Sequence, residues 1–324
     1  MARRPATARS GMALILTLSA IVLAGGLALL LQARAAGRVA LEKREWTHER
    51  LRIAAAEAAR EALFTLASDE DLAVDHLGED WADVRAALTP DGISTLAQVE
   101  DAGRFYNWNH AVASNGASRL PRDILLDLLS LCGDLNPVIR VEALGDFLDE
   151  DGEGTYEAAF YQALTPPYAP ADRLLWAPAE LMAVHGFSVD LFAPREGLDS
   201  ADLFGGDLNA CTMVLPVALE QPVPININTA NHDVLLAMTG LEQEAAIRAL
   251  LALRHVQPFE SLAALAVVHP GAAATMGGTL SVRSDYFRVR ARAALEDQHH
   301  TVQAWVHRDE DGDVHILQWV EGVG

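Results

Sequence analysis

Cysteine is scarce in this chain of 324 residues, which contains only Cys132 and Cys211. This scarcity excludes the dense disulfide framework of small secreted domains, and there is no CxxC pair to hold a metal or carry out redox chemistry. Two cysteines this far apart can form one disulfide in an oxidising compartment or remain as two buried thiols. The sequence leaves both possibilities open.

Basic residues are also fewer than acidic ones. The chain contains 24 lysine and arginine residues against 45 aspartate and glutamate residues, which gives a formal net charge of −21. Acidic residues are spread along the chain beyond Glu42 and the arginines are scattered, so no basic patch offsets the negative field. Such a chain repels the phosphate backbone of a nucleic acid. The composition therefore counts against a nucleic-acid-binding protein.

Catalytic motifs are absent as well. The sequence has no GxSxG nucleophile elbow, no HExxH motif, no phosphate-binding glycine loop and no dinucleotide fingerprint. His299 and His300 are adjacent, so on a strand their side chains point to opposite faces and do not bind one metal together. We therefore expect a protein that is not an enzyme.

One long apolar run lies near the beginning of the chain. Arg3, Arg4 and Arg9 precede Gly11, and residues 12–31 then carry no charge. A run of about 20 apolar residues is long enough to cross a bilayer as a helix. Because the basic residues come first, the N-terminus is expected in the cytoplasm and the rest of the chain is expected to be exported.

Three interpretations of this run are open. It can be a plain membrane anchor, or a secretory signal peptide cleaved after Ala35, although the apolar core of such peptides usually spans roughly 7–15 residues. It also resembles a type IV pilin-like leader, which prepilin peptidase cuts after Gly11 so that the mature chain begins at Met12. Most pilins carry a glutamate at the fifth mature position, whereas this chain has Leu16 there.

The remaining pattern predicts an α+β fold. Residues 38–67 are rich in alanine and have apolar residues at helical spacing, which extends the apolar run into a long helix. Several short helical patterns follow from residue 120, separated by proline-rich loops. From residue 279 apolar and polar residues alternate, and the turn from Asp309 to Asp313 is typical of a hairpin. A mostly helical insertion in a frame of long helix and antiparallel strands explains this order.

Several blocks, in this order, resemble the K-type minor pseudopilins of type II secretion systems, or general secretion pathway protein K. The leader with Leu16 in place of glutamate is typical of that family. Residues 103–109, GRFYNWN, resemble its Gly-Arg-Phe-Asn stretch, with Tyr106 disturbing the spacing, and residues 145–153, GDFLDEDGE, resemble its Asp-Trp-x-Asp-x-Asp loop. The blocks ELMAVHGF and ININTANHDVLLAM are also similar. The combination of blocks is specific, and the resemblance extends over nearly the whole chain.

This resemblance implies a pilin-like fold with a long N-terminal helix, an antiparallel sheet and a large helical inserted domain. The expected division of the chain is a prepilin leader (1–11), a transmembrane helix (12–32), a spine helix and first part of the pilin-like domain (33–110), the helical insertion (111–278) and the C-terminal strands (279–324).

The same resemblance implies a function. The chain is expected at the tip of the periplasmic pseudopilus, anchored once in the bacterial inner membrane with its C-terminal domain in the periplasm, and required for pseudopilus assembly and protein export. The implied partners are the I- and J-type minor pseudopilins, the major pseudopilin and prepilin peptidase. A minor pilin of a type IV pilus and an anchored or exported DNA-binding protein are the alternatives.

The DNA alternative rests on residues 224–268, which are similar to the helix-hairpin-helix, or SAM-like, module of DNA-binding proteins. Such modules contact phosphate through a glycine-hydrophobic-glycine turn. Here only Gly240 is present, and Glu242 stands where the second glycine would fall. Because carboxylates repel phosphate, we expect a structural subdomain and no nucleic-acid partner. Its predicted core consists of Val234, Leu235, Met238, Ile247 and Leu250.

The loop at the start of this module contains three polar residues with predicted structural roles. Asn226 and Asn228 are expected to tie the loop backbone together. Thr229 is expected to cap the helix that follows.

An acidic loop is the candidate metal site. It contains Asp146, Asp149 and Asp151, and Glu157 lies just beyond. Calcium takes six to eight oxygen ligands, and closely spaced carboxylates can supply several of them. The spacing is not that of a complete EF-hand, so a solvated acidic turn is an equal alternative. The family resemblance implies calcium, with Asp149, Asp151 and Glu157 as ligands and Asp146 as a further ligand or a brace of the loop.

Overall fold

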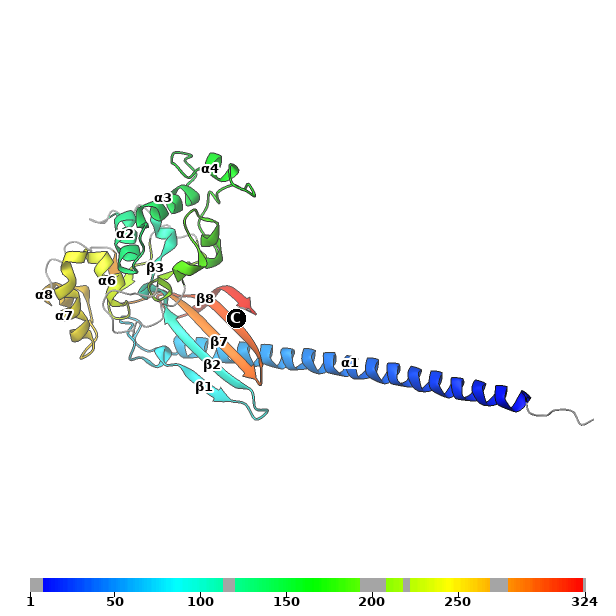
Figure 1. Ribbon diagram of the computed structural model, residues 1–324. Helices are drawn as coiled ribbons and strands as arrows, with labels where there is room; N and C mark the ends of the chain where they lie inside the picture. The colour runs from blue at the N-terminus through cyan, green and yellow to red at the C-terminus, as the bar shows by residue number, and fades with distance from the viewer. Residues whose placement is uncertain (1–7, 113–119, 193–207, 218–221, 269–278, 323–324) are drawn as a thin grey trace, which may run out of the picture.

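The structure is a computed structural model that describes residues 8–112, 120–192, 208–217, 222–268 and 279–322. Its N-terminal helix α1 (Ala8–Ala67) is 60 residues long and projects far beyond the rest of the molecule (Figure 1). The side chains from Met12 to Val39 are all exposed. Among the described residues, α1 is the one helix long and apolar enough to cross a membrane.

The C-terminal half of α1 packs on an antiparallel sheet. Within the described residues the sheet has five strands, in the order β1 (Arg85–Leu88), β2 (Ser94–Asp101), β7 (Tyr286–Leu295), β8 (Gln298–Arg308) and β9 (Val314–Glu321). The period-two pattern assigns the faces of β7. Phe287 and Val289 are buried toward α1, and the alternate residues Arg288 and Arg290 lie on the opposite, outer face. The α+β frame expected from the sequence is confirmed.

Small side chains bring α1 close to the sheet. Ala55, Ala59 and Ala62 form one stripe of the helix, between Leu51 and Leu66, and all five have 1% or less of their surface exposed. Alanine side chains allow the helix to approach the strands, and each buried leucine contributes roughly 1.5–3 kcal/mol relative to exposure. The resulting core contains apolar residues of β2, β7 and β8.

A turn at residues 89–92 connects β1 to β2. The backbone N–H of Thr89 donates to the carbonyl of Ile93 over 2.9 Å, and Gly92 donates back to Thr89 over 2.9 Å. Gly92 has a φ of 79°, which glycine adopts without the steric cost that other residues meet. Strand β1 itself was not expected from the sequence.

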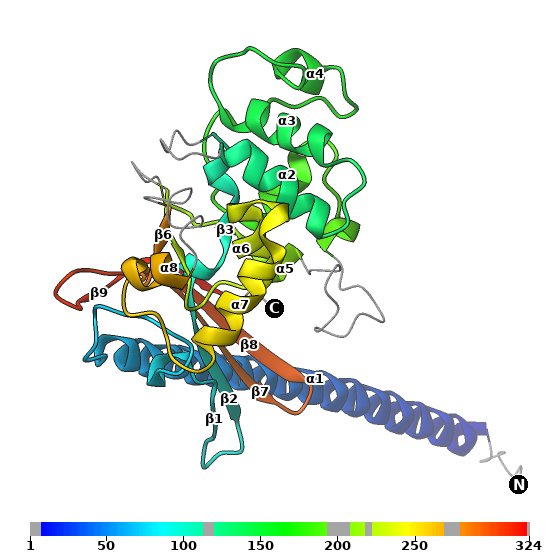
Figure 2. The same cartoon turned by 90° about the vertical axis from the view of Figure 1, so that its left-hand side faces the viewer.

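The helical insertion occupies the chain between β2 and β7, and both views place it at one end of the sheet (Figures 1 and 2). Its helices are α2 (Pro121–Leu131), α3 (Pro137–Leu148), α4 (Ala158–Gln162), α5 (Leu208–Cys211), α6 (His232–Thr239), α7 (Glu244–Arg254) and α8 (Leu262–Val268). Two short parallel pairs join distant segments of it: β3 (Tyr106–Asn107) with β4 (Thr212–Met213), and β5 (Ile225–Asn226) with β6 (Leu280–Ser281).

The insertion has its own hydrophobic core, separate from that of the sheet. Tyr106 and Trp108, which precede the border expected at residue 111, already pack in this core. Cys132 and Cys211 are both buried in it, and no disulfide bond joins them. The core positions predicted for the helix-hairpin-helix-like subdomain, from Val234 to Leu250, are buried.

Candidate functional site

The first candidate site is the N-terminal part of α1. Gly11 and Met12, the residues of the expected leader cut, lie inside this helix, whereas residues 1–7 of the leader lie outside the described residues. Met12 and Leu16 have 66% and 65% of their surface exposed. The helix therefore presents an uncovered apolar surface to lipid or to other helices from Met12 onward.

The second candidate site is the acidic loop between α3 and α4. Asp149 follows the last residue of α3, Asp151 lies in the loop, and Glu157 immediately precedes α4. One carboxylate oxygen from each of these three residues lies within 4.8 Å of the others. The fold thus brings together the three predicted calcium ligands.

Asp146 braces this loop from the last turns of α3. Its Oδ2 accepts a hydrogen bond of 2.8 Å from the backbone N–H of Tyr156. Gly154 packs directly against the same carboxylate, so closely that a Cβ on residue 154 would collide with it. The Oδ1 of Asp151 accepts the N–H of Glu153 over 2.7 Å. Hydrogen bonds within the loop therefore fix its shape.

The carboxylates of the loop repel one another. Burial raises the pKa of Asp149, and the charges of Asp151 and Asp146 raise it further. The pKa of Glu157 is raised by burial first and then by Asp146 and Asp149. Asp149 Oδ1 and Glu157 Oε1 are buried and have no hydrogen-bond partner in the part of the chain that the structure describes. A cation would relieve both the repulsion and the missing contacts.

Asp172 is a further acidic neighbour that the sequence pattern did not reveal. Its charge contributes to the raised pKa of both Asp149 and Glu157. Its backbone N–H donates to the carbonyl of Phe147 over 3.1 Å, which holds it beside the end of α3. Asp172 lies in a proline-rich loop well away from the acidic run, so no local spacing could have predicted this contact.

These residues fit calcium. The donors are carboxylate oxygens, which hard cations prefer, and part of the set is unpaired. Asp149, Asp151 and Glu157 would hold the ion, while Asp146, already engaged with Tyr156, is placed as the brace. A bound ion would supply positive charge that cross-links the end of α3 to the start of α4.

A second group of acids, Asp69, Asp75 and Glu79, is explained by protein contacts. Arg308 donates from Nη1 to Asp69 Oδ2 over 2.7 Å and from Nη2 to Asp75 Oδ1 over 2.5 Å. Glu79 Oε2 accepts the N–H of His76 over 2.7 Å and the indole N–H of Trp81 over 2.8 Å. This group is a structural ion-pair network, because its carboxylates already have donors.

The loop that begins the helix-hairpin-helix-like subdomain joins the insertion to the sheet. The side-chain N–H groups of Asn226 donate to Asp101 Oδ2, Ser284 Oγ and the carbonyl of Asp75, each over 3.1 Å. The amide of Asn228 makes two hydrogen bonds with the backbone of Phe259, of 3.0 and 2.8 Å. Asn228 therefore ties loop backbone as expected. Asn226 does so too, because its Oδ1 accepts the backbone N–H of Asn228 over 2.9 Å, and its N–H groups also reach the sheet frame.

The expected role of Thr229 is wrong. The cap of α6 is Asn231, whose side chain accepts the N–H of Val234 over 2.9 Å. Thr229 instead donates from its hydroxyl to Asp101 Oδ2 over 2.5 Å, and it is buried. Asn231 immediately precedes α6 and has an extended backbone, whereas Thr229 lies two residues too early for this position.

The turn between α6 and α7 carries negative charge where a DNA-binding turn meets phosphate. Gly240 has a φ of 107°, and the carboxylate of Glu242 folds back against it, within 2.7 Å of the position that a Cβ on Gly240 would take. Phosphate approaching this turn would meet a carboxylate. The geometry therefore supports a structural role for the subdomain.

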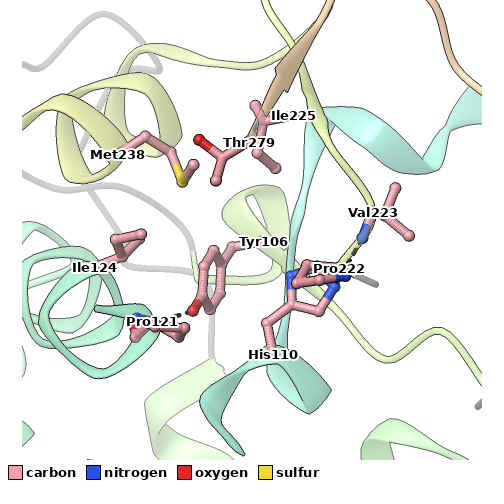
Figure 3. A pocket seen from close by; sticks show the side chains of 9 residues that line it. All are labelled: Tyr106, His110, Pro121, Ile124, Pro222, Val223, Ile225, Met238 and Thr279. Carbon is pink, nitrogen blue, oxygen red and sulfur yellow. Dashed lines mark hydrogen bonds between the residues drawn. The ribbon is translucent and has the colours of Figure 1, made fainter. Parts of the chain in front are cut away.

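A small cavity lies inside the insertion, between Tyr106, His110 and Met238 (Figure 3). The hydroxyl of Tyr106 donates to the carbonyl of Pro121 over 2.9 Å, and the backbone N–H of Val223 donates to His110 Nε2 over 3.2 Å. The cavity volume is about 20 Å³, which is room for about one water molecule. It is a packing feature and not a ligand site.

The chain was compared with known protein families and with individual proteins. No family model matches the chain. Type II secretion system protein K of Aeromonas hydrophila is 24% identical over 343 residues, which cover 97% of this chain and 97% of that protein. The protein of the same name from Pseudomonas aeruginosa is 26% identical over 265 residues, which cover 78% of this chain and 72% of that protein.

The fold was compared with solved structures. One chain in the crystal structure of the GspK-GspI-GspJ complex from the type 2 secretion system of enterotoxigenic Escherichia coli superposes with a TM-score of 0.67 at 22% identity. The match covers 87% of this chain and 99% of that one. The resemblance to type II secretion system protein K and the α+β pilin-like fold, both expected from the sequence, are therefore confirmed over most of the chain.

Proposed function

We propose that this chain is the K-type minor pseudopilin of a type II secretion system, located at the tip of the pseudopilus and needed for its assembly and for protein export. One observation carries the proposal: a helix with an uncovered apolar half continues into a sheet domain, and a large helical domain is inserted between β2 and β7. The fold match to a chain of the GspK-GspI-GspJ complex supports it.

The exposed face of α1 supports assembly through helix packing. Trp46 and Phe64 lie on the part of α1 that packs on the sheet, yet 68% and 74% of their surface is exposed. Large apolar side chains uncovered on a spine helix are typical of an interaction surface. We propose that neighbouring I- and J-type minor pseudopilins, and the major pseudopilin below them, cover this face.

The position of the insertion supports a place at the tip. Figure 1 shows the insertion at the opposite end of the molecule from the apolar half of α1. With α1 anchored in the inner membrane, the bulk of the insertion would lie on the periplasmic side and at the far end of a filament. The basic residues Arg3, Arg4 and Arg9 support this orientation. The role is structural and requires no catalytic residues.

The experiment is mass spectrometry of the mature N-terminus, from cells with and without prepilin peptidase. A mature chain that begins at Met12 only when the peptidase is present, with or without N-methylation, is the expected result. A chain that begins at Ala36 would indicate an ordinary signal peptide and would overturn the proposal. Immunoprecipitation of the I- and J-type proteins with this chain separates a pseudopilus from a type IV pilus.

A DNA-binding function is the weaker candidate. Its support is the helix-hairpin-helix-like arrangement of α6 and α7, but Glu242 occupies the side of the turn that phosphate would approach. Titration of the purified chain with duplex DNA at two salt concentrations tests it. Tight binding with a steep salt dependence would favour this function over the pseudopilin.

A further inference from the structure

Arg104 is a partly buried arginine with no ion-pair partner among the described residues. It lies in the short 3-10 helix (Ala102–Arg104) that follows β2, where the chain leaves the sheet for the insertion. Its Nε is buried without a hydrogen-bond acceptor, and no described carboxylate forms an ion pair with its guanidinium. Its guanidinium lies over the ring of Phe105, whose centroid is 5.2 Å from Cζ. A buried donor without an acceptor costs free energy, so its presence requires an explanation.

Further arginines lie beside it. The Cζ of Arg288 is 5.1 Å from the centroid of the same Phe105 ring and 5.5 Å from the ring of Trp305. Arg254, the last residue of α7, donates from Nη1 to the carbonyls of Ile227 and Ala230 over 2.8 and 2.5 Å. The guanidinium of Arg254 has no described carboxylate as a partner.

The contacts of these residues place them near one another. Arg104 and Arg288 both lie over the ring of Phe105. Arg254 binds the carbonyl of Ile227, directly after β5, and the carbonyl of Pro224, directly before β5, lies 3.1 Å from the position that a Cβ on Gly103 would take. Their effects on one another's pKa agree with this arrangement. Burial lowers the pKa of Arg254 to about 10, and the charge of Arg104 is the second cause. Burial also lowers the pKa of Arg288, to which the charges of Arg290 and Arg104 contribute.

Glu100 supplies a carboxylate beside these arginines. It contacts Arg288 and Arg290, each over 2.9 Å. Arg104 and Arg254 therefore remain uncompensated, although the whole chain has a net charge of −21. Local positive charge in so acidic a chain, partly removed from water, requires a negative counterpart.

We propose that Arg104, together with Arg254 and Arg288, forms a binding site for an oxyanion, a carboxylate or a phosphate group, at the junction of the sheet and the helical insertion. Guanidinium groups suit this ligand because their planar N–H donors match two oxygens of such a group. The three residues come from the 3-10 helix after β2, the end of α7 and the start of β7. The site therefore exists only when the insertion is packed on the sheet, and a bound anion would cross-link the two domains. The inference does not depend on the proposed role in secretion.

The test is isothermal titration calorimetry of the full chain in detergent at pH 7.5. Inorganic phosphate and acetate are titrated separately into chloride buffer at constant ionic strength. The variants are Arg104→Gln, Arg254→Gln and Arg104→Lys, and the matched control is Arg292→Gln, which removes an exposed arginine from the outer face of β7. Far-UV circular dichroism accompanies each variant.

The expected result is binding of phosphate, acetate or both by the wild type and by Arg292→Gln with equal affinity. Loss of the charge-assisted contacts in Arg104→Gln and Arg254→Gln should weaken binding by about tenfold or more, with Arg104→Lys between them and the wild type. Binding of phosphate alone identifies a phosphate site, and binding of acetate identifies a carboxylate site. The proposal is overturned if the wild type binds neither anion, or if Arg104→Gln or Arg254→Gln binds as the wild type does.

Discussion

The side-chain amide of Asn226 donates a hydrogen bond of 3.1 Å to Asp101 Oδ2, across 125 positions of the sequence. The hydroxyl of Thr229 donates to the same carboxylate oxygen, and all three residues are buried. Because Asp101 ends β2 and Asn226 lies in β5, one carboxylate holds the insertion against the sheet. The orientation of the two domains is thus fixed by polar contacts as well as by apolar packing.

Removing this amide should loosen the junction. We expect Asn226→Ala to lower the free energy of unfolding by about 1–3 kcal/mol, because it leaves the buried Asp101 short of a donor. Gln162→Ala, at an exposed glutamine of the same insertion, should change it by less than about 0.5 kcal/mol. Urea denaturation followed by tryptophan fluorescence measures both variants. Equal midpoints for the two would contradict the role of Asn226.

His110 should make the stability sensitive to acid. Its Nε2 accepts the N–H of Val223, which requires the neutral ring, and burial lowers its pKa to about 4. Between pH 6.5 and pH 4 the unfolded chain therefore binds a proton that the folded chain does not, so stability is lost as the pH falls through this range. The full loss corresponds to about 3 kcal/mol.

A matched variant isolates this contribution. Asp75 and Asp101 act in the opposite direction, because burial raises the pKa of each and the folded chain then binds protons more readily. The measurement is therefore the difference in free energy of unfolding between the wild type and His110→Gln, from pH 7.5 to pH 4.5. We expect this difference to move in favour of the variant as the pH falls, and a constant difference would exclude the role of His110.

The sheet shows what could be predicted from the sequence. The strands β7 and β8 alternate apolar and polar residues over most of their length, because one face packs on α1. Strand β1 has the sequence RAAL, with no β-branched or aromatic residue. It pairs with β2, to which a short turn connects it. It could not be predicted because its position depends on its neighbour and not on its own pattern.

The candidate metal site likewise includes residues that could be predicted from the sequence and a neighbour that could not. Asp149, Asp151 and Glu157 lie close together in the sequence, and the family resemblance implied them as calcium ligands. Asp172 was not predictable, since the loop that carries it reaches the end of α3 only in the folded chain. The contact of Asn226 with Asp101 was hidden for the same reason. Local spacing indicates side chains that share one loop, whereas contacts between distant segments require the fold.

Calcium should stabilise the acidic loop. We expect the chelator EGTA to lower the midpoint of thermal unfolding of the wild type, because a cation offsets the repulsion among Asp149, Asp151 and Glu157. Asp149→Asn should abolish this effect and, in EGTA, should be at least as stable as the wild type. Protons compete with calcium at groups with raised pKa values, so the calcium effect should shrink as the pH falls.

Differential scanning fluorimetry with and without calcium measures this effect. The matched control is Asp311→Asn, which removes a carboxylate from the acidic turn between β8 and β9 and should respond to calcium as the wild type does. Loss of the response in both variants, or in neither, would place calcium elsewhere.

Two glycines near the loop should respond differently to substitution. In Gly154→Ala the new methyl group meets the Asp146 carboxylate, so it should displace the brace and weaken calcium binding. Gly145→Ala meets no atom within 4 Å and lies inside α3. Because alanine favours a helix over glycine, Gly145→Ala should raise the free energy of unfolding by roughly 0.5–1 kcal/mol. Calcium titrations and urea denaturation of both variants check this contrast, which would be wrong if Gly154→Ala kept full calcium affinity.

Leu16 carries the last prediction. Most pilins have a glutamate at the fifth position of the mature chain, which is Leu16 here when the chain begins at Met12. This glutamate meets the N-terminal amine of the next subunit, and a subunit at the tip has no next subunit. In Leu16→Glu the carboxylate would lie in an apolar surface without a partner, where an ionised group is costly. We expect fewer pseudopili and less secretion, whereas Leu16→Ile, which keeps the surface apolar, should behave as the wild type. Secretion assays at matched protein levels measure the effect, and an unchanged phenotype in Leu16→Glu would remove the support that Leu16 gives to a place at the tip.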